Sequence, residues 1–585
     1  MRKTVSSVLL GLSLLSPACK SAARDATVER QELSAAVERQ ELRSARPGVA
    51  ASSDSKAMPA DPVATAEPVA TPEPAKLSET TTAHTGAAAG SGAQLPNVAT
   101  KPDPMAYRPT APKQADKNAG PAGGDATGSE GYHDWGRNPW VDAAKDHLST
   151  FAADVDTASY TIMRRKLNEG ALPPPAAVRV EELVNYFRYA FPSPATDSPF
   201  AIVMDAAPSP LSPGRHILRV GVATKALSQR ERKPAHLVFL VDVSGSMASP
   251  DKLELAKQSL RILTNNLKDG DTVSLITYAG SSRVVLPPTG LDHKATILSS
   301  IEGLFVGGST AMGSGLDLAY QQAMLGLQPG AISRVIVCTD GDANVGSHTH
   351  DEILKIIAGR AKEGVTLSTI GFGVGNYKDE LMEQLADKGN GNNFYIDSLS
   401  AAKKVFQEQL GSTLEVVAKD VKLQVDFDPK LVSRYRLVGY ENRDIKDDDF
   451  RNDKVDAGEI GAGHQVTALY ELELTDQAKL TNAPLGGVRI RHKQPRGEKA
   501  TEAAFPMVGG AAASFANAPA DLRFAFAVAA FADVLRNGQD AEHWSLPQIR
   551  DLAKLAAGDD ADRKELVGLI DRAIKLRGPD RHASR

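Results

Sequence analysis

Cysteine is almost absent from this sequence, which has only two in 585 residues. Two cysteines cannot build a disulfide framework or a zinc site made from paired Cys-x-x-Cys motifs. The sequence also has no uninterrupted apolar run of about 18 residues, so we predict no transmembrane helix. A formal net charge of -5 with interspersed signs provides no basic face, and we therefore expect no nucleic-acid partner.

Motifs of common hydrolases are missing as well. The sequence contains no HExxH zinc motif, no GxSxG nucleophile motif and no cysteine–histidine set for nucleophilic catalysis. A metal-assisted hydrolase needs a general base or nucleophile beside its metal. We therefore expect the protein not to be an enzyme, and a metal-assisted hydrolase is the least favoured alternative.

The N-terminal sequence, "MRKTVSSVLLGLSLLSPAC", has two cations, a short apolar run and small residues ahead of Cys19. This order predicts an export signal that is too short to span a membrane. The ending Ser-Pro-Ala-Cys resembles the lipobox of bacterial lipoproteins. The resemblance implies a signal peptide over 1–18, a lipid on Cys19 and a membrane-anchored place in the bacterial cell envelope, either periplasmic or surface-exposed. The alternative is an ordinary secretory signal with an incidental cysteine.

Residues 19–130 are predicted to form a disordered tether. Most of this stretch consists of Ala, Pro, Thr, Ser and Gly, as in "PADPVATAEPVATPEPAK", with few large apolar side chains. Such a composition cannot bury enough surface to offset the chain entropy lost on folding. Folded sequence is expected from residue 131, with a first helix that runs to Leu167 and takes Asp156 or Thr157 as its N-terminal cap.

From residue 235 to 413, apolar strands alternate with helical stretches. Segments such as "HLVFLVDV", "TVSLITYA" and "SRVIVCTD" are apolar over most of their length, which is typical of a parallel sheet covered on both faces. The alternation predicts a doubly wound α/β domain with a mainly parallel sheet. After it, short alternating strands predict an antiparallel β region at 414–515, and residues 516–585 are expected to be helical, beginning with a helix apolar enough to be buried.

The segment 131–234 ends in two further strand candidates, "PFAIVMDAAPS" and "RHILRVGVAT". We expect these strands to join the antiparallel sheet formed after Leu414. The two flanking regions then build one body around the inserted α/β domain. This arrangement predicts that the two ends of the inserted domain lie together.

Side chains that carry oxygen follow two of the predicted strands and precede one helix. Functional groups of an open parallel sheet collect at the carboxyl ends of its strands. Carboxylate and hydroxyl oxygens suit a hard cation, Mg²⁺ or Mn²⁺, better than zinc or copper. The alternative is that these residues only cap helices or form turns. The candidates are Asp242 at the end of the first strand, Ser244 and Ser246 at alternate positions after it, Thr310 in "GGST", and Asp340 at the end of "VIVCTD".

The segments "DVSGSM", "GGST" and "CTDGD", in this order, resemble the metal-ion-dependent adhesion site (MIDAS) of von Willebrand factor type A (VWA) domains. The resemblance implies that all five candidates bind Mg²⁺, directly or through water, and that an acidic residue of a protein partner completes the metal's coordination. The segments "DVDTASYTIMRRKLNEGALPPPAAVRVEELVNYF" and "LVGYENRDIKDDDFRNDKVDAGEIGAGHQVTALYEL" resemble the conserved flanking regions of one bacterial lipoprotein family with such a domain. Together these resemblances cover 132–585.

The sequence therefore favours a lipid-anchored binding protein that holds a protein partner through a metal ion and an acidic residue. The alternative is a structural or assembly factor of the envelope whose binding does not depend on metal. Metal dependence of partner binding separates these two functions.

Overall fold

The computed structural model describes residues 130–578, except 196–197, 229, 310, 342–348, 411–413, 496, 539–540 and 542. The predicted signal peptide, Cys19 and the predicted tether up to residue 129 lie outside the described residues, and so does Thr310. None of the helices in the described part of the chain combines the length and the apolar character needed to cross a membrane.

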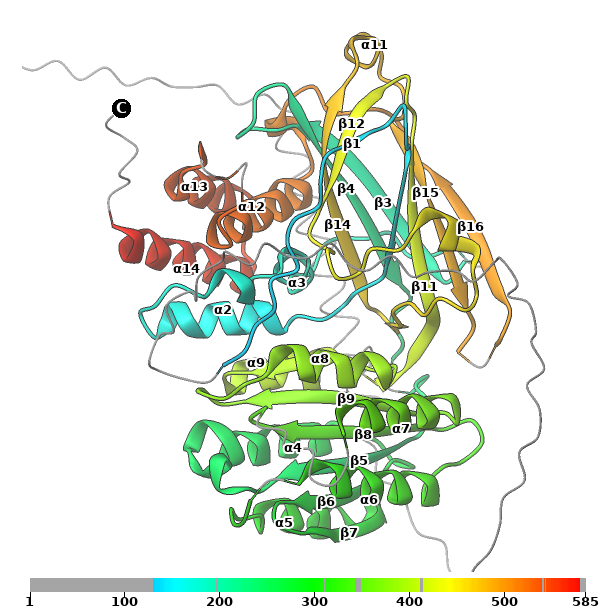
Figure 1. The fold of residues 1–585 in the computed structure, drawn as a ribbon, viewed down its shortest axis with the longest axis vertical. Coiled ribbons are helices and arrows are strands. Elements are labelled where there is room, and N and C mark those ends of the chain that lie inside the picture. Colours follow the sequence, from blue (N-terminus) through cyan, green and yellow to red (C-terminus); the bar gives the residue numbers. More distant parts are fainter. Residues whose placement is uncertain are drawn as a thin grey trace, which may run out of the picture. The chain divides into compact units, whose positions relative to one another are not determined.

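The inserted domain is built on a six-stranded sheet (Figure 1). Its strands are β5 (Ala235–Asp242), β6 (Thr272–Tyr278), β7 (Ser282–Gly290), β8 (Ile332–Thr339), β9 (Val365–Phe372) and β10 (Asn393–Ile396). Their spatial order is β10-β9-β8-β5-β6-β7, and every neighbouring pair is parallel except β6 with β7. Every residue of β5 is buried, as its apolar sequence predicted.

Helices cover both faces of this sheet. On one face lie α4 (Leu255–Asn265), α5 (Lys294–Glu302) and α9 (Leu399–Lys403). On the other lie α6 (Met312–Leu325), α7 (His350–Lys362) and α8 (Asp379–Lys388). Phe239 of β5 belongs to the hydrophobic core on the first face and Leu240 to the core on the second. Alternate residues of one strand thus enter two cores, and the prediction of a doubly wound α/β domain is confirmed.

Strands from both flanking regions form two antiparallel sheets (Figure 1). The strands are β1 (Val141–Asp142), β2 (Leu148–Ala152), β3 (Phe200–Pro208), β4 (Arg215–Thr224), β11 (Val416–Phe427), β12 (Val432–Val438), β13 (Ile460–Gly461), β14 (Gln465–Leu474), β15 (Gly486–Lys493) and β16 (Ala500–Pro506). One sheet has the order β1-β12-β14-β4-β3. The other has the order β13-β11-β15-β16, with β2 also paired to β11. The two sheets share one hydrophobic core, which contains Val220 of β4 and Val425 of β11.

The pairing of the two flanking regions confirms the prediction made from their strand patterns. β4 runs antiparallel to β14, from Arg215 opposite Glu473 to Ala223 opposite Gln465, and β3 pairs with β4. The ends of the inserted domain also meet. The backbone N–H of Lys233 donates to a Glu415 carboxylate oxygen at 3.0 Å, and the Lys233 ammonium lies 2.8 Å from the other oxygen.

The helices of the flanking regions share a core of their own. They are α2 (Ala158–Asn168), α3 (Val180–Asn185), α12 (Ala520–Leu535), α13 (Leu546–Ala556) and α14 (Ala561–Arg577). Every residue of α12 from Phe524 to Leu535 is buried, which confirms the prediction for this helix. Shorter helical segments include η1 (Pro175–Ala177), η2 (Gly245–Ala248), η3 (Pro250–Glu254), η4 (Leu291–His293), η5 (Lys404–Glu408), η6 (Asp447–Arg451), α11 (Asp476–Lys479) and η7 (Phe515–Asn517).

The start of α2 differs from the prediction. Thr157 occupies the N-cap position, but its side chain makes no capping hydrogen bond. Asp156 instead accepts a hydrogen bond from the backbone N–H of Asn393 in β10, at 3.0 Å. The backbone N–H of Ser159, in the first turn, donates to Glu182 at 2.8 Å. Contacts with distant residues therefore take the place of a local cap.

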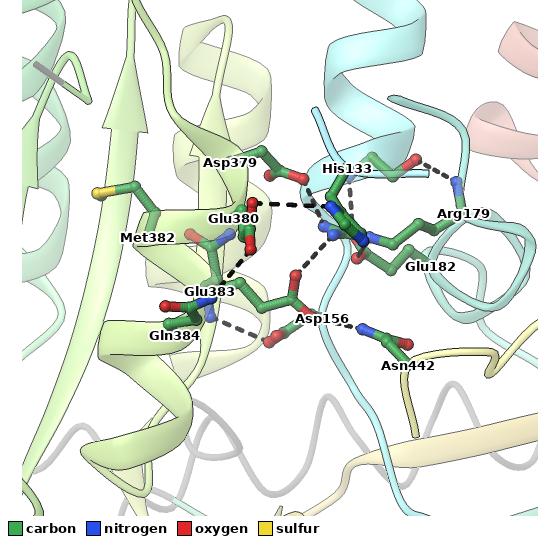
Figure 2. A network of polar contacts seen from close by, with 12 residues as sticks. His133, Asp156, Arg179, Glu182, Asp379, Glu380, Met382, Glu383, Gln384 and Asn442 are labelled. Carbon is green, nitrogen blue, oxygen red and sulfur yellow. Dashed lines mark hydrogen bonds and ion pairs between the residues drawn. The ribbon is translucent and has the colours of Figure 1, made fainter. Parts of the chain in front are cut away.

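A buried ionic network joins the inserted domain to the flanking regions, and most of its members are labelled in Figure 2. Arg179, directly before α3, lies 2.9 Å from Asp379 and 2.6 Å from Glu383, both on α8, and it also pairs with Glu182. Asn442 donates a further hydrogen bond to Glu383 at 2.7 Å. Burial raises the pKa of Glu182 and of Asp379, and the positive charge of Arg179 opposes this rise. Arg179 is thus the counter-charge for carboxyl groups from both parts of the chain.

Candidate metal centre

Asp242 lies at the end of β5, where the central strand leaves the sheet. Its buried carboxyl accepts a hydrogen bond from the backbone N–H of Ser244 at 2.9 Å and another from the Thr339 hydroxyl at 3.0 Å. Burial raises the pKa of Asp242. The hydrogen bonds from Ser244 and Thr339 lower it, and the negative charge of Asp340 raises it again, so the net shift is upward. A cation beside this carboxyl would offset both effects that disfavour its ionised form.

Ser244 and Ser246 turn toward each other after the strand. Their hydroxyl oxygens are 2.9 Å apart, and the Ser246 hydroxyl also hydrogen-bonds to Asp340. Ser244 is buried, whereas Ser246 is partly exposed. The two serines therefore connect the carboxyl of Asp242 to that of Asp340.

Asp340 follows β8, the parallel neighbour of β5, and is fully buried. One of its oxygens lies 2.9 Å from the ammonium of Lys252, which also donates to the amide oxygen of Asn376 at 3.1 Å. Burial raises the pKa of Asp340, but hydrogen bonds from Lys252, Asn376 and Ser246 and the charge of Lys252 bring it below its usual value. Sequence reasoning missed Lys252, because in "SPDKLELAK" it has the spacing of an ordinary helix residue.

Thr310, the fifth predicted ligand, is not among the described residues. The glycine loop ahead of it is described and lies against the turn that follows Asp242. The N–H of Gly307 donates to the carbonyl of Val243 at 2.7 Å, and the N–H of Gly245 donates to the carbonyl of Gly308 at 3.1 Å. Gly308 has a φ of 89°, a left-handed conformation that favours glycine. The sequence "GGST" is thereby suited to this close approach.

Carboxylate and hydroxyl oxygens thus converge at the carboxyl edge of the parallel sheet. The described residues contain no group of three or more His, Cys, Asp and Glu side chains that could hold a metal ion. A metal centre at this edge therefore depends on serine hydroxyls in addition to two carboxyls. Such an all-oxygen set fits Mg²⁺ or Mn²⁺. Two ionised carboxyls facing one ammonium also leave one negative charge for a cation to neutralise.

A cavity of about 1050 Å³ lies at the opposite end of the same sheet. Its walls include Ile332 at the start of β8, Thr366 near the start of β9 and Val416 at the start of β11, together with charged side chains of both signs. None of the four described site residues, Asp242, Ser244, Ser246 and Asp340, lines this cavity. Cavity size therefore does not identify the candidate centre; the chemistry of its side chains does.

Comparison with known families and proteins covers nearly all of the described chain. The von Willebrand factor type A domain model matches residues 236–408, a von Willebrand factor model matches 126–219, and the model for the C-terminal part of uncharacterized protein YfbK matches 412–576. Uncharacterized protein YfbK of Escherichia coli (strain K12) is 41% identical over 473 residues, which are 76% of this chain and 81% of that protein. Uncharacterized protein sll0103 of Synechocystis sp. is 27% identical over 283 residues, which are 48% of this chain and 66% of that protein.

Two solved structures are also similar. A von Willebrand factor type A protein from Catenulispora acidiphila is 18% identical, covers 66% of this chain and 91% of its own, and has a TM-score of 0.38. Proximal thread matrix protein 1 from the mussel byssus, with a zinc-occupied MIDAS motif, is 21% identical, covers 32% of this chain and 46% of its own, and has a TM-score of 0.26. The family assignment rests on the sequence matches.

Proposed function

Because the chain belongs to the YfbK family of von Willebrand factor type A domain proteins, we propose that it is a binding protein of the bacterial cell envelope. A lipid on Cys19 anchors it to a membrane. The carboxyl edge of its parallel sheet binds a protein partner through Mg²⁺ or Mn²⁺ and an Asp or Glu residue of that partner.

The observation that carries this proposal is the convergence of Asp242, Asp340 and the two serine hydroxyls at one edge of the sheet. Thr310 is the fifth residue that the proposal assigns to the metal. Bound among these oxygens, Mg²⁺ supplies a coordination position that a carboxylate of the partner can take. Asp242 and Asp340 are buried and hydrogen-bonded, so the protein holds both carboxyls in place without the partner.

The proposed role is binding and not catalysis. In the described part of the chain, the hydroxyls of Ser244 and Ser246 contact each other, and Ser246 also contacts Asp340. A serine nucleophile needs an adjacent general base that is itself held in position by a third group. The arrangement of these two serines is typical of metal ligands.

We expect Asp242→Ala to weaken Mn²⁺ binding at least about 100-fold, because the change removes a ligand and one of two negative charges; loss of an outer partner alone costs 10- to 100-fold. Isothermal titration calorimetry of the full chain with Mn²⁺ and with Mg²⁺ measures this loss. Asp292→Ala is a suitable control, since that side chain is 76% exposed on η4. Equal affinities of the two variants would contradict the assignment of Asp242 to the metal.

The partner is tested by affinity capture from membrane extract, with the protein as bait in Mg²⁺, in EDTA and as Asp242→Ala. A partner that is retained in Mg²⁺ and lost in both other arms supports a metal bridge. A partner retained in all three arms overturns the metal bridge and favours the assembly factor with metal-independent binding.

We expect Cys19→Ser to remove lipid labelling and to move the protein from the membrane fraction to the soluble fraction, because the lipid is the membrane contact that this proposal provides. Metabolic labelling with palmitate and fractionation of the cells measure both effects. Cys338→Ser is the control, since the Cys338 thiol is buried in β8 and its removal leaves the lipid in place. Persistence of Cys19→Ser in the membrane fraction would refute the anchor.

A further inference from the structure

The ammonium group of Lys252 lies inside the candidate metal centre. Lys252 belongs to η3, directly after the turn that carries Ser244 and Ser246. Its ammonium is 2.9 Å from the Asp340 carboxylate and 3.1 Å from the amide oxygen of Asn376, and only 9% of the side chain is exposed. The lysine therefore contributes a fixed positive charge and not a mobile surface group.

The loop that follows β9 packs against the Lys252 side chain and keeps it in place. Gly373, directly after β9, has a φ of 73°, and a Cβ at this position would lie 2.1 Å from Cγ of Lys252. The absence of a side chain at residue 373 thus makes room for the stem of the lysine. The neighbouring Asp251 accepts a hydrogen bond from the N–H of Val374 at 3.1 Å, so the segment of Lys252 is fastened to the same loop.

The loop that carries Asn376, the second acceptor of the ammonium, is held on both sides of this residue by residues outside the inserted domain. The N–H of Gly375 donates to the carboxylate of Glu130 at 3.0 Å, and the N–H of Gly131 donates to the carbonyl of Tyr377 at 3.0 Å. Asn376 thus lies in a loop that is fixed on both sides. The fold therefore holds the acceptor of the Lys252 ammonium, and with it the ammonium, in a defined position.

The balance of charges among Asp242, Asp340 and Lys252 affects how tightly this edge of the sheet can bind a metal ion. When Asp242 and Asp340 are ionised they carry two negative charges, and Lys252 neutralises one of them. In the metal-free protein the ammonium is the counter-charge that touches Asp340. A divalent cation bound to the same carboxyls meets the ammonium as a like charge, and repulsion over a few ångströms in a partly buried site is strong.

We propose that Lys252 is an internal counterion of Asp340 that stabilises the metal-free centre and lowers its affinity for divalent metal. This inference rests on the proposed function and names a residue that tunes the same site. The centre is then expected to exchange its metal with solution, and its occupancy follows the metal concentration around the protein.

Lys252→Met tests the inference, because methionine keeps an apolar stem and removes the charge. Calorimetric titration of the full chain with Mn²⁺ is expected to show binding at least about tenfold tighter than in the wild type, since the repulsion is gone. In EDTA, the variant is expected to unfold at a lower temperature than the wild type, because Asp340 has lost the positive charge of Lys252. Added Mn²⁺ is expected to remove this difference in unfolding temperature.

Lys257→Met is the matched control. The Lys257 side chain is also 9% exposed, lies on α4 close to η3, and donates to Glu254 at 2.8 Å. Its removal is expected to leave Mn²⁺ affinity unchanged. An equal gain in affinity in this variant would overturn the inference, because the effect would then not be specific to the contact with Asp340.

The outcomes separate this inference from the proposed function. If the wild type binds Mn²⁺ and Lys252→Met binds it no more tightly, the counterion role fails and the proposed function stands. If only Lys252→Met binds Mn²⁺, the metal function of the wild type fails and the counterion role stands. If neither protein binds Mn²⁺, both are overturned.

Discussion

Replacement of Arg179 by methionine is expected to lower the free energy of unfolding by about 3–5 kcal/mol, the range for breaking a buried ion pair from one side. Arg179 contacts Glu182, Asp379 and Glu383, and all four side chains are 10% exposed or less. Loss of the guanidinium leaves Glu182 and Asp379 without this ion pair, at positions where burial already raises their pKa. The network in Figure 2 is therefore expected to break at its centre.

Chemical unfolding at pH 7 and at pH 5 measures this loss. A carboxyl whose pKa is raised in the folded state binds protons more readily there than in the unfolded chain, so stability rises as the pH falls. The deficit of Arg179→Met is accordingly expected to shrink at pH 5. Arg451→Met is the control, because that arginine is 65% exposed beside Glu502, and its loss is expected to cost far less than the loss of Arg179. Similar losses in the two variants would contradict the role of burial.

A loss of about 3–5 kcal/mol is also expected for Phe524→Ala, the range for truncation of a buried phenylalanine. Phe524 is fully buried in α12. Its ring lies 4.9 Å from the ring of Phe187 in an edge-to-face arrangement and 4.6 Å from the guanidinium of Arg563. Truncation leaves a cavity in a close-packed core and removes both ring contacts.

The control for this variant is Phe305→Ala, since the Phe305 side chain is 72% exposed. We expect it to change the free energy of unfolding by less than about 0.5 kcal/mol. Urea unfolding of both variants, followed by circular dichroism, measures the difference. If Phe524→Ala unfolds at the same urea concentration as the wild type, α12 does not have the structural role that its burial indicates.

The inserted domain could be predicted because hydrophobic pattern alone decides its main features. The continuous apolar sequence of β5 requires cover on both faces, and Phe239 and Leu240 enter separate cores. The sequence also predicted that strands of the first flank join the antiparallel sheet of the second, but it did not predict which strand β4 pairs with. Both predictions depend on the pattern of apolar residues, which local sequence carries.

The candidate centre was predictable only in part. Asp242, Ser244, Ser246 and Asp340 follow strands that end at the same edge, so topology brings them together. The contact of Lys252 with Asp340 could not be predicted, because the two residues are 88 positions apart in the sequence. The stem of Lys252 also passes close to Gly373, in space that a side chain at residue 373 would fill. Ion pairs of this kind depend on where side chains meet in space, and no spacing in the sequence encodes that.

The insertion of one domain between strands of another also sets an order of assembly during synthesis. Among the described residues, the strands of the inserted domain pair with one another, within Ala235–Ile396, so their pairing does not wait for the second flank. β4 must wait for β14, which begins at Gln465. At about 5–20 residues per second, the ribosome takes roughly 10–50 s to make the chain between them. For that time the first flank has unpaired strand edges, the feature by which strands pair with other chains. Because the ends of the insert meet at Lys233 and Glu415, folding of the insert brings the two halves of the outer body within reach of each other.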